Sequence, residues 1–143
     1  MTRADIVAAA RGWIGTPYHH QASLKGIGCD CLGLLRGVWR EVVGAEPASP
    51  PPYTRDWAEA GGRERLIEAA LTYLQPIGAD AFGAGDVLVF RWRPRVPAKH
   101  CGIATSPAAM VHAHEGAAVA EVALSPWWSR HLAAAFRFPG IAP

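Results

Sequence analysis

The chain has 143 residues, of which 50% are hydrophobic and six are tryptophan, and its formal net charge is only +2. This length and composition are those of one ordinary domain with a buried core, so we expect a single domain over residues 1–143. Lysine and arginine are scattered rather than clustered, which argues against a nucleic-acid partner. The apolar runs are far shorter than the ~20 residues that a membrane-spanning helix needs, which argues against membrane insertion.

The N-terminal segment predicts a helix. Thr2 is a suitable N-cap, and Ile6, Ala10 and Trp13 recur on one helical face until Gly15 ends the pattern. An early arginine and aspartate interrupt a short apolar stretch, which is not the pattern of a secretory signal peptide. We therefore expect synthesis in the cytoplasm, and delivery to any outer compartment by something other than a signal of the chain's own.

A second helix is predicted after a loop over residues 15–28, which has glycine and proline at its ends. Asp30 occupies the N-cap position, so Cys31 is expected to be the first helical residue. From there to Gly44 the apolar residues recur at spacings of three and four, as on the buried face of a helix. These residues are Leu34, Leu35, Val38, Trp39 and Val42.

Residues 45–54 are rich in proline and predict a stiff, extended surface segment. Asp56 follows as a candidate N-cap for a third helical region. The apolar residues of that region extend from Leu66 to Leu74.

The second half of the chain predicts short strands separated by glycine, proline, serine or charged residues. The candidate strands cover residues 85–92, 100–105, 109–114, 117–124 and 133–140. Because helices come first and strands afterwards, we expect an α+β fold, with the N-terminal helices packed on one face of a C-terminal antiparallel sheet.

Cys31 is the candidate nucleophile. The N–H groups and dipole at a helix N-terminus favour a thiolate and lower a cysteine pKa from ~8.5 to roughly 3.5–7.5. The capping Asp30 and three nearby glycines favour this role over that of a small core residue, the usual role of a free cysteine. We expect three free thiols, with Cys29 packed in the interior; Cys101 is the alternative disulfide partner for one of the other two.

Histidines in two predicted strands are candidates for the catalytic base. His100 opens one strand and His112 lies in the next, so a tight turn between antiparallel strands places their side chains roughly opposite each other. One imidazole can then activate the thiol while the other orients the first, as in a catalytic triad. His114 shares a face with His112 and is the alternative orienting residue. The remaining histidines, in predicted loop or surface positions, are His19, His20 and His131.

Zinc binding is the alternative use of the same side chains. The potential ligands are Cys29, Cys31, His100, Cys101, His112 and His114. No cysteine pair has the two-residue gap of familiar zinc sites, and Cys29 with Cys31 makes an awkward chelate. We therefore expect thiol chemistry with no metal and no cofactor.

The order of several short motifs resembles the NlpC-type cysteine peptidases. The motifs are "GTPY", "DCLGL", "GDVLVF", "HCGIAT" and "MVHA", and the similarity covers nearly the whole chain. The helical segment "DCLGLLRGVWRE" is similar to that of phage and gene-transfer-agent cell-wall peptidases. The resemblance implies a papain-like α+β fold and cleavage of peptidoglycan stem peptides, typically between D-glutamate and a diamino acid.

The resemblance also implies roles for individual residues. Cys31 matches the nucleophile, His100 the general base and His112 the third, orienting residue. Tyr18 matches a tyrosine that helps to bind the oxyanion; its alternative role is to pack on the first helix. The chain departs from many relatives at Leu32, where they have serine, and in the loop that follows Tyr18, which lacks their Gly-Gly.

We expect a cysteine peptidase that hydrolyses peptidoglycan stem peptides, carried by a phage tail or tail-like particle to the periplasm or cell wall. One alternative is a tail or wall-binding module that kept the fold without the chemistry. Another is a thiol amidase or acyltransferase that acts on a different amide. The complete set of matched catalytic positions favours an enzyme, whereas the residues do not choose between amide substrates.

Overall fold

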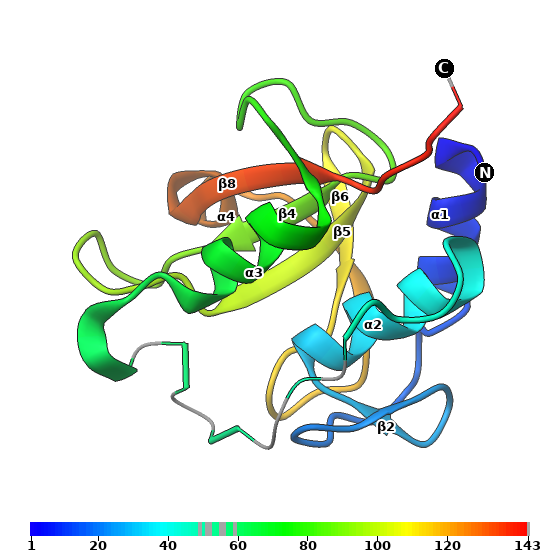
Figure 1. Cartoon of the computed structure of the whole chain (residues 1–143), viewed down its shortest axis with the longest axis horizontal. Coiled ribbons are helices and arrows are strands. Elements are labelled where there is room, and N and C mark those ends of the chain that lie inside the picture. The colour runs from blue at the N-terminus through cyan, green and yellow to red at the C-terminus, as the bar shows by residue number, and fades with distance from the viewer. Residues whose placement is uncertain (49, 51–52, 55–56, 59, 143) are drawn as a thin grey trace.

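The computed structural model describes residues 1–48, 50, 53–54, 57–58 and 60–142 of the chain. Its centre is a six-stranded antiparallel sheet with the strand order β3-β8-β4-β5-β6-β7 (Figure 1). The strands are β3 (Gln75–Ile77), β4 (Val87–Phe90), β5 (His100–Ser106), β6 (Ala109–His112), β7 (Ala120–Ala123) and β8 (Leu132–Arg137).

Four α-helices surround this sheet: α1 (Arg3–Arg11), α2 (Cys31–Val42), α3 (Arg65–Tyr73) and α4 (Pro126–His131). The first two pack on each other and on β5, whereas α4 lies toward the other end of the sheet (Figure 1). The predicted α+β architecture, with helices on an antiparallel sheet, is thus confirmed. No helix of the described residues is both long and apolar enough to cross a bilayer.

Alternation along the strands divides the core into two clusters, one on each face of the sheet. The larger cluster, toward the first three helices, contains Val89, Cys101 and Ile103. The smaller cluster contains Phe90 and Ala104, against which Trp128 of α4 and other residues pack. His100 and Ala104 are separated by an even number of positions in β5, so both side chains point to the same face of the sheet, the one that α4 covers. The side chain of Cys101 points to the opposite face, toward α2.

The structure contains four short elements that the sequence patterns did not predict. They are α4, β3, and the two strands of a hairpin inside the predicted loop, β1 (Ser23–Leu24) and β2 (Gly28–Cys29). The third helix begins at Arg65 after Glu64. Asp56, which was predicted to cap this region, lies outside the described residues.

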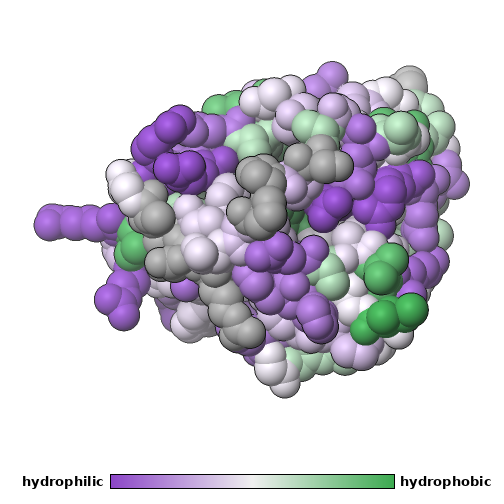
Figure 2. Space-filling model, turned by 60° about the horizontal axis from the view of Figure 1, so that its bottom comes forward, coloured by the Kyte–Doolittle hydropathy of each residue, from purple (hydrophilic) through white to green (hydrophobic). Residues whose placement is uncertain are grey.

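The β1–β2 hairpin lies against the start of α2 and exposes apolar side chains at its turn. Leu24 and Ile27 are 60% and 73% exposed. The face of the molecule in Figure 2 is mostly polar, with hydrophobic atoms gathered mainly at one corner. Outside that turn the hairpin is anchored, because the Ser23 hydroxyl donates to the Gly33 carbonyl oxygen at 2.6 Å.

Candidate active site

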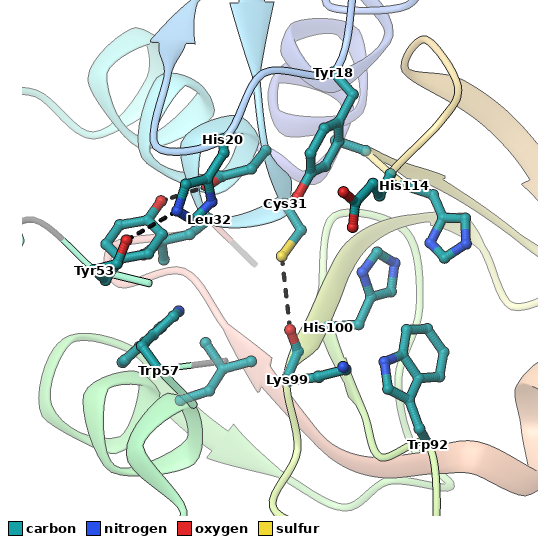
Figure 3. A pocket seen from close by; sticks show the side chains of 14 residues that line it. Tyr18, His20, Cys31, Leu32, Tyr53, Trp57, Trp92, Lys99, His100 and His114 are labelled. Carbon is teal, nitrogen blue, oxygen red and sulfur yellow. Dashed lines mark hydrogen bonds and ion pairs between the residues drawn. The ribbon is translucent and has the colours of Figure 1, made fainter. Parts of the chain in front are cut away.

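A cavity of about 130 Å³ opens beside the first turn of α2. Its wall includes Tyr18, Cys31, Trp92, His100 and His114, which come from the N-terminal loop, α2 and the ends of the central strands (Figure 3). Segments far apart in the sequence therefore meet around the Cys31 side chain.

Asp30 holds the start of α2 and the preceding loop together. Its carboxylate accepts the backbone N–H of Gly33 at 2.7 Å, as expected of an N-cap, and the N–H of Gln21 at 2.8 Å. The hydroxyl of Tyr53 also donates to it. Gln21 has a φ of 66°, in the left-handed region that few side chains tolerate, so this carboxylate stabilises a strained turn beside the cavity.

Cys31 is half-buried and is the first residue of α2, where backbone N–H groups have no partner within the helix. Its thiol lies 3.9 Å from the Lys99 carbonyl oxygen (Figure 3), and the Cys101 thiol donates to the Cys31 carbonyl oxygen at 3.4 Å. The neighbouring Cys101 thiol and the His100 imidazole lower the pKa of Cys31 well below its ordinary value, against the opposing effect of burial. The hydrogen bond with Cys31, burial and the charges of Cys31 and Asp30 raise the pKa of Cys101, so the thiolate is favoured at Cys31.

His100 and His112 form a buried hydrogen-bonded pair. Their side chains join through Nε2 of His100 and Nδ1 of His112 at 2.9 Å, and the residues are 4% and 7% exposed. Burial, with the neighbouring His100 and His114, lowers the pKa of His112 to about 3, so His112 is neutral at ordinary pH. A neutral His112 that carries its proton on Nε2 can accept the Nε2–H of His100, and in that tautomer Nδ1 of His100 is the nitrogen available to the thiol.

The two imidazoles meet diagonally rather than directly across the strands. The cross-strand partner of His112 is Gly102, because the tight turn between β5 and β6 sets that register. The prediction of side chains roughly opposite each other was therefore right about contact but inexact about register. His114 stacks on His112 with ring centroids 5.9 Å apart and lines the cavity. The hydrogen-bond partner of His100 is His112.

Tyr18 lies beside Cys31 in the cavity wall (Figure 3). Its backbone bridges to Cys29, next to the cap of α2. Its ring lines the cavity and points toward Cys31 (Figure 3), rather than only packing on the first helix. Tyr18 and Cys31 therefore line the same cavity.

The described residues contain no group of three or more His, Cys, Asp or Glu side chains arranged to hold a metal ion. The potential zinc ligands identified in the sequence are divided between environments. Cys29 and Cys101 lie in the apolar cluster on the helix side of the sheet, whereas His100 and His112 pair with each other.

The comparison with protein families agrees with this arrangement. The model of the NlpC/P60 family matches residues 15–137, which include all of the residues described above. The chain belongs to the NlpC/P60 family. No curated protein is similar enough in sequence to match the chain.

Solved NlpC/P60 structures share the fold. The NlpC/p60 domain of the peptidoglycan hydrolase SagA is 26% identical with a TM-score of 0.67, and the match covers 96% of this chain and 100% of that one. For an NlpC/P60 protein from Bacillus cereus, 17% identical, the TM-score is 0.68 and the shares are 96% and 40%. A lipoprotein-like family member from Staphylococcus aureus is 22% identical with a TM-score of 0.63, and the match covers 99% of this chain and 42% of that one. The chain thus spans less than half the length of the last two proteins.

The sequence analysis missed several residues of this NlpC/P60 site. Tyr53 comes from the proline-rich segment, Trp92 follows β4, and Lys99 precedes His100. His20 also lines the cavity and lies 3.9 Å from the Asp30 carboxylate, although its loop position suggested a surface residue. An aromatic residue between two arginines at the end of a predicted strand was the one pattern that pointed to Trp92.

Proposed function

We propose that this NlpC/P60 protein is a cysteine peptidase that hydrolyses amide bonds in peptidoglycan stem peptides. The observation that carries the proposal is that Cys31, at a helix N-terminus, and His100 line one cavity, while His100 is joined to the buried His112 by a hydrogen bond. The SagA domain, which the chain resembles over its whole length, is part of a peptidoglycan hydrolase, and this supports the choice of substrate class.

In the proposed reaction Cys31 is the nucleophile and His100 the general base. Nδ1 of His100 takes the thiol proton, and the thiolate attacks the carbonyl carbon to form a tetrahedral intermediate. The imidazolium then protonates the leaving amine, so that an acyl thioester remains on Cys31. His100 next removes a proton from water, and the resulting attack releases the acid and restores the thiol.

The other residues support this sequence of proton transfers. His112 accepts the Nε2–H of His100 and so holds the tautomer in which Nδ1 carries the lone pair. In this proposal the Cys31 backbone N–H and the Tyr18 hydroxyl stabilise the oxyanion, and one such donor contributes about 3 kcal/mol to transition-state stabilisation.

We further propose that the bond cleaved joins D-glutamate to a diamino acid, and that the protein acts with a phage tail or tail-like particle. The first rests on the resemblance to the NlpC-type peptidases, and the second on the resemblance of "DCLGLLRGVWRE" to phage and gene-transfer-agent peptidases. Mass spectrometry of digests of defined stem peptides identifies the bond. Proteomics of purified particles from the producing cells tests the second point, and consistent absence of the chain from them would exclude it.

The decisive experiment for the activity compares wild type with Cys31→Ala on purified sacculi and defined stem peptides. We expect the variant to lose at least about 10³-fold in kcat/KM while its circular dichroism is unchanged, because only the nucleophile is removed. Cys29→Ala is the matched control and is expected to stay active. Full activity of Cys31→Ala contradicts the mechanism, and sacculus binding without cleavage by wild type supports a wall-binding module instead.

A further inference from the structure

Two tryptophans enclose the imidazole of His100. The ring of Trp92 stacks on it with centroids 5.3 Å apart and planes 22° apart. The ring of Trp128, in α4, stacks on it at 5.6 Å and 30°. The two indoles also contact each other at 5.9 Å, so they form a continuous aromatic cover.

Trp128 extends this cover over the second imidazole. Its ring meets that of His112 edge-on, with centroids 5.1 Å apart and planes 84° apart. Trp128 is itself held against the sheet by Phe90, at 4.9 Å. The His100–His112 hydrogen bond thus lies between the sheet and an indole that contacts both of its partners.

We propose that Trp128, assisted by Trp92, is a positioning residue for the reaction, which excludes water from the His100–His112 hydrogen bond. The expected effect on reaction rate rests on the proposed function. The exclusion of water from the hydrogen bond does not. Water that reached Nδ1 of His112 would compete for the proton of His100 and release the His100 ring from its orientation.

The neutral state of His112 depends on this exclusion of water. His112 can accept a hydrogen bond at Nδ1 only while it is unprotonated, and burial is the main cause of its low pKa. The titratable neighbours that act on it are His100 on β5 and His114 beyond β6, both of which oppose its protonation. Its cross-strand partners, Gly102 and Ala120, carry no charge, and neither does Trp128.

The test is the NMR titration of the His112 imidazole in the full chain. In wild type we expect His112 to remain neutral down to about pH 4. In Trp128→Leu we expect its titration midpoint to rise by about one pH unit or more, because the charged form becomes hydrated. Trp128→Phe keeps an aromatic cover and is expected to restore most of the wild-type value.

Trp127→Leu is the matched control. Trp127 neighbours Trp128 in α4 and is 43% exposed, and its ring contacts among the described residues are to Trp92, Trp128 and His131. Because it touches neither His100 nor His112, its loss is expected to leave the His112 midpoint unchanged.

The acid limb of kcat/KM provides the second readout. We expect this limb to move to higher pH in Trp128→Leu by the same amount as the His112 titration midpoint. The loss of kcat/KM is expected to be smaller near pH 8 than in acid. A merely structural role would instead lower kcat/KM equally at every pH. Trp92→Leu, which uncovers His100 alone, is the second variant should Trp128→Leu not fold. An unchanged His112 midpoint in folded Trp128→Leu overturns the inference. A shifted midpoint in a protein that cleaves no stem peptide overturns the proposed function and leaves the inference standing.

Discussion

The three cysteines show how neighbouring positions acquire different reactivity. Cys31 is half-buried at the start of α2 beside His100, whereas Cys29 and Cys101 are 0% and 1% exposed. Burial, followed by the charges of Asp30 and Cys31, raises the pKa of Cys29 to about 12. A difference of two positions in the sequence therefore separates a thiol with a raised pKa from one with a lowered pKa.

The pH dependence of alkylation checks this difference. We expect iodoacetamide to modify Cys31 rapidly below pH 7 in the native protein, because its lowered pKa maintains a thiolate there. Cys29 and Cys101 are expected to react only slowly, and peptide mass spectrometry distinguishes the three sites.

Two controls make the alkylation result specific. In guanidinium all three cysteines are expected to follow one profile near pH 8.5, the value for free thiols. His100→Ala is expected to slow the alkylation of Cys31 below pH 7, because the adjacent imidazole that lowers the pKa of Cys31 is lost. Native Cys31 that reacts only above pH 8 is evidence for a structural thiol.

At the scale of elements, α2 is positioned by glycines that allow close approach. A Cβ at Gly37 would lie 2.0 Å from the ring of Trp13, which follows α1 and is 2% exposed. A Cβ at Gly33 would lie 1.8 Å from the Ala22 carbonyl oxygen. The helix that carries the nucleophile therefore contacts both α1's end and the loop before the hairpin without side chains between them.

Gly37→Ala is expected to destabilise the protein by about 1–3 kcal/mol, the usual cost of overpacking a core. The higher helix propensity of alanine, worth about 1 kcal/mol, does not compensate, because the rigid indole of Trp13 cannot move aside. Urea denaturation followed by circular dichroism measures the free energy of unfolding.

The matched control is Gly12→Ala, where the nearest atom to the new Cβ is the mobile Lys25 Nζ. This control is expected to cost much less than Gly37→Ala. Equal stabilities of wild type and Gly37→Ala contradict the close packing of α2 on Trp13.

At the scale of the whole molecule, Asp86 links the two ends of the chain. The fully buried carboxylate accepts two hydrogen bonds from Arg137 of β8, each of 3.0 Å, and lies 3.2 Å from the Arg3 guanidinium of α1. Burial alone would raise the pKa of Asp86, but hydrogen bonds from Arg137, the Gly83 backbone and Arg3 outweigh it and lower the pKa.

Asp86→Asn is expected to lower the free energy of unfolding at pH 7 by about 3 kcal/mol, the lower end of the range for breaking a buried ion pair. The lower end applies because the side chains of Arg3 and Arg137 are 36% and 30% exposed and remain partly hydrated. Glu41→Gln, which breaks a surface pair with Lys25, is the control and is expected to cost less than about 1 kcal/mol.

The pH dependence of the Asp86 contribution has a definite sign. Because the folded pKa is below the ordinary value of 3.8, the stabilisation is complete above that pH and is lost as the pH falls through the folded value. Wild type should therefore lose its advantage over Asp86→Asn only in acid below about pH 3.8. A constant difference down to pH 2 would show that the carboxylate charge is not responsible.

The sequence by itself determined the features that depend on neighbours along the chain. The N-cap at Asp30, the start of α2 at Cys31 and the alternating strands follow from propensities and periodicity over short windows, as does the order of the motifs. These signals were sufficient for the fold class and for Cys31 and His100 as residues of the candidate site.

Only the tertiary structure decided which residues complete the site. The diagonal register made His112, rather than His114, the hydrogen-bond partner of His100, and the six-residue α4 placed Trp128 over that pair. Tyr53 reached Asp30 across 23 positions of the chain. Elements of two to six residues have little local preference, so their positions are set by burial against distant segments, which no pattern of adjacent residues encodes.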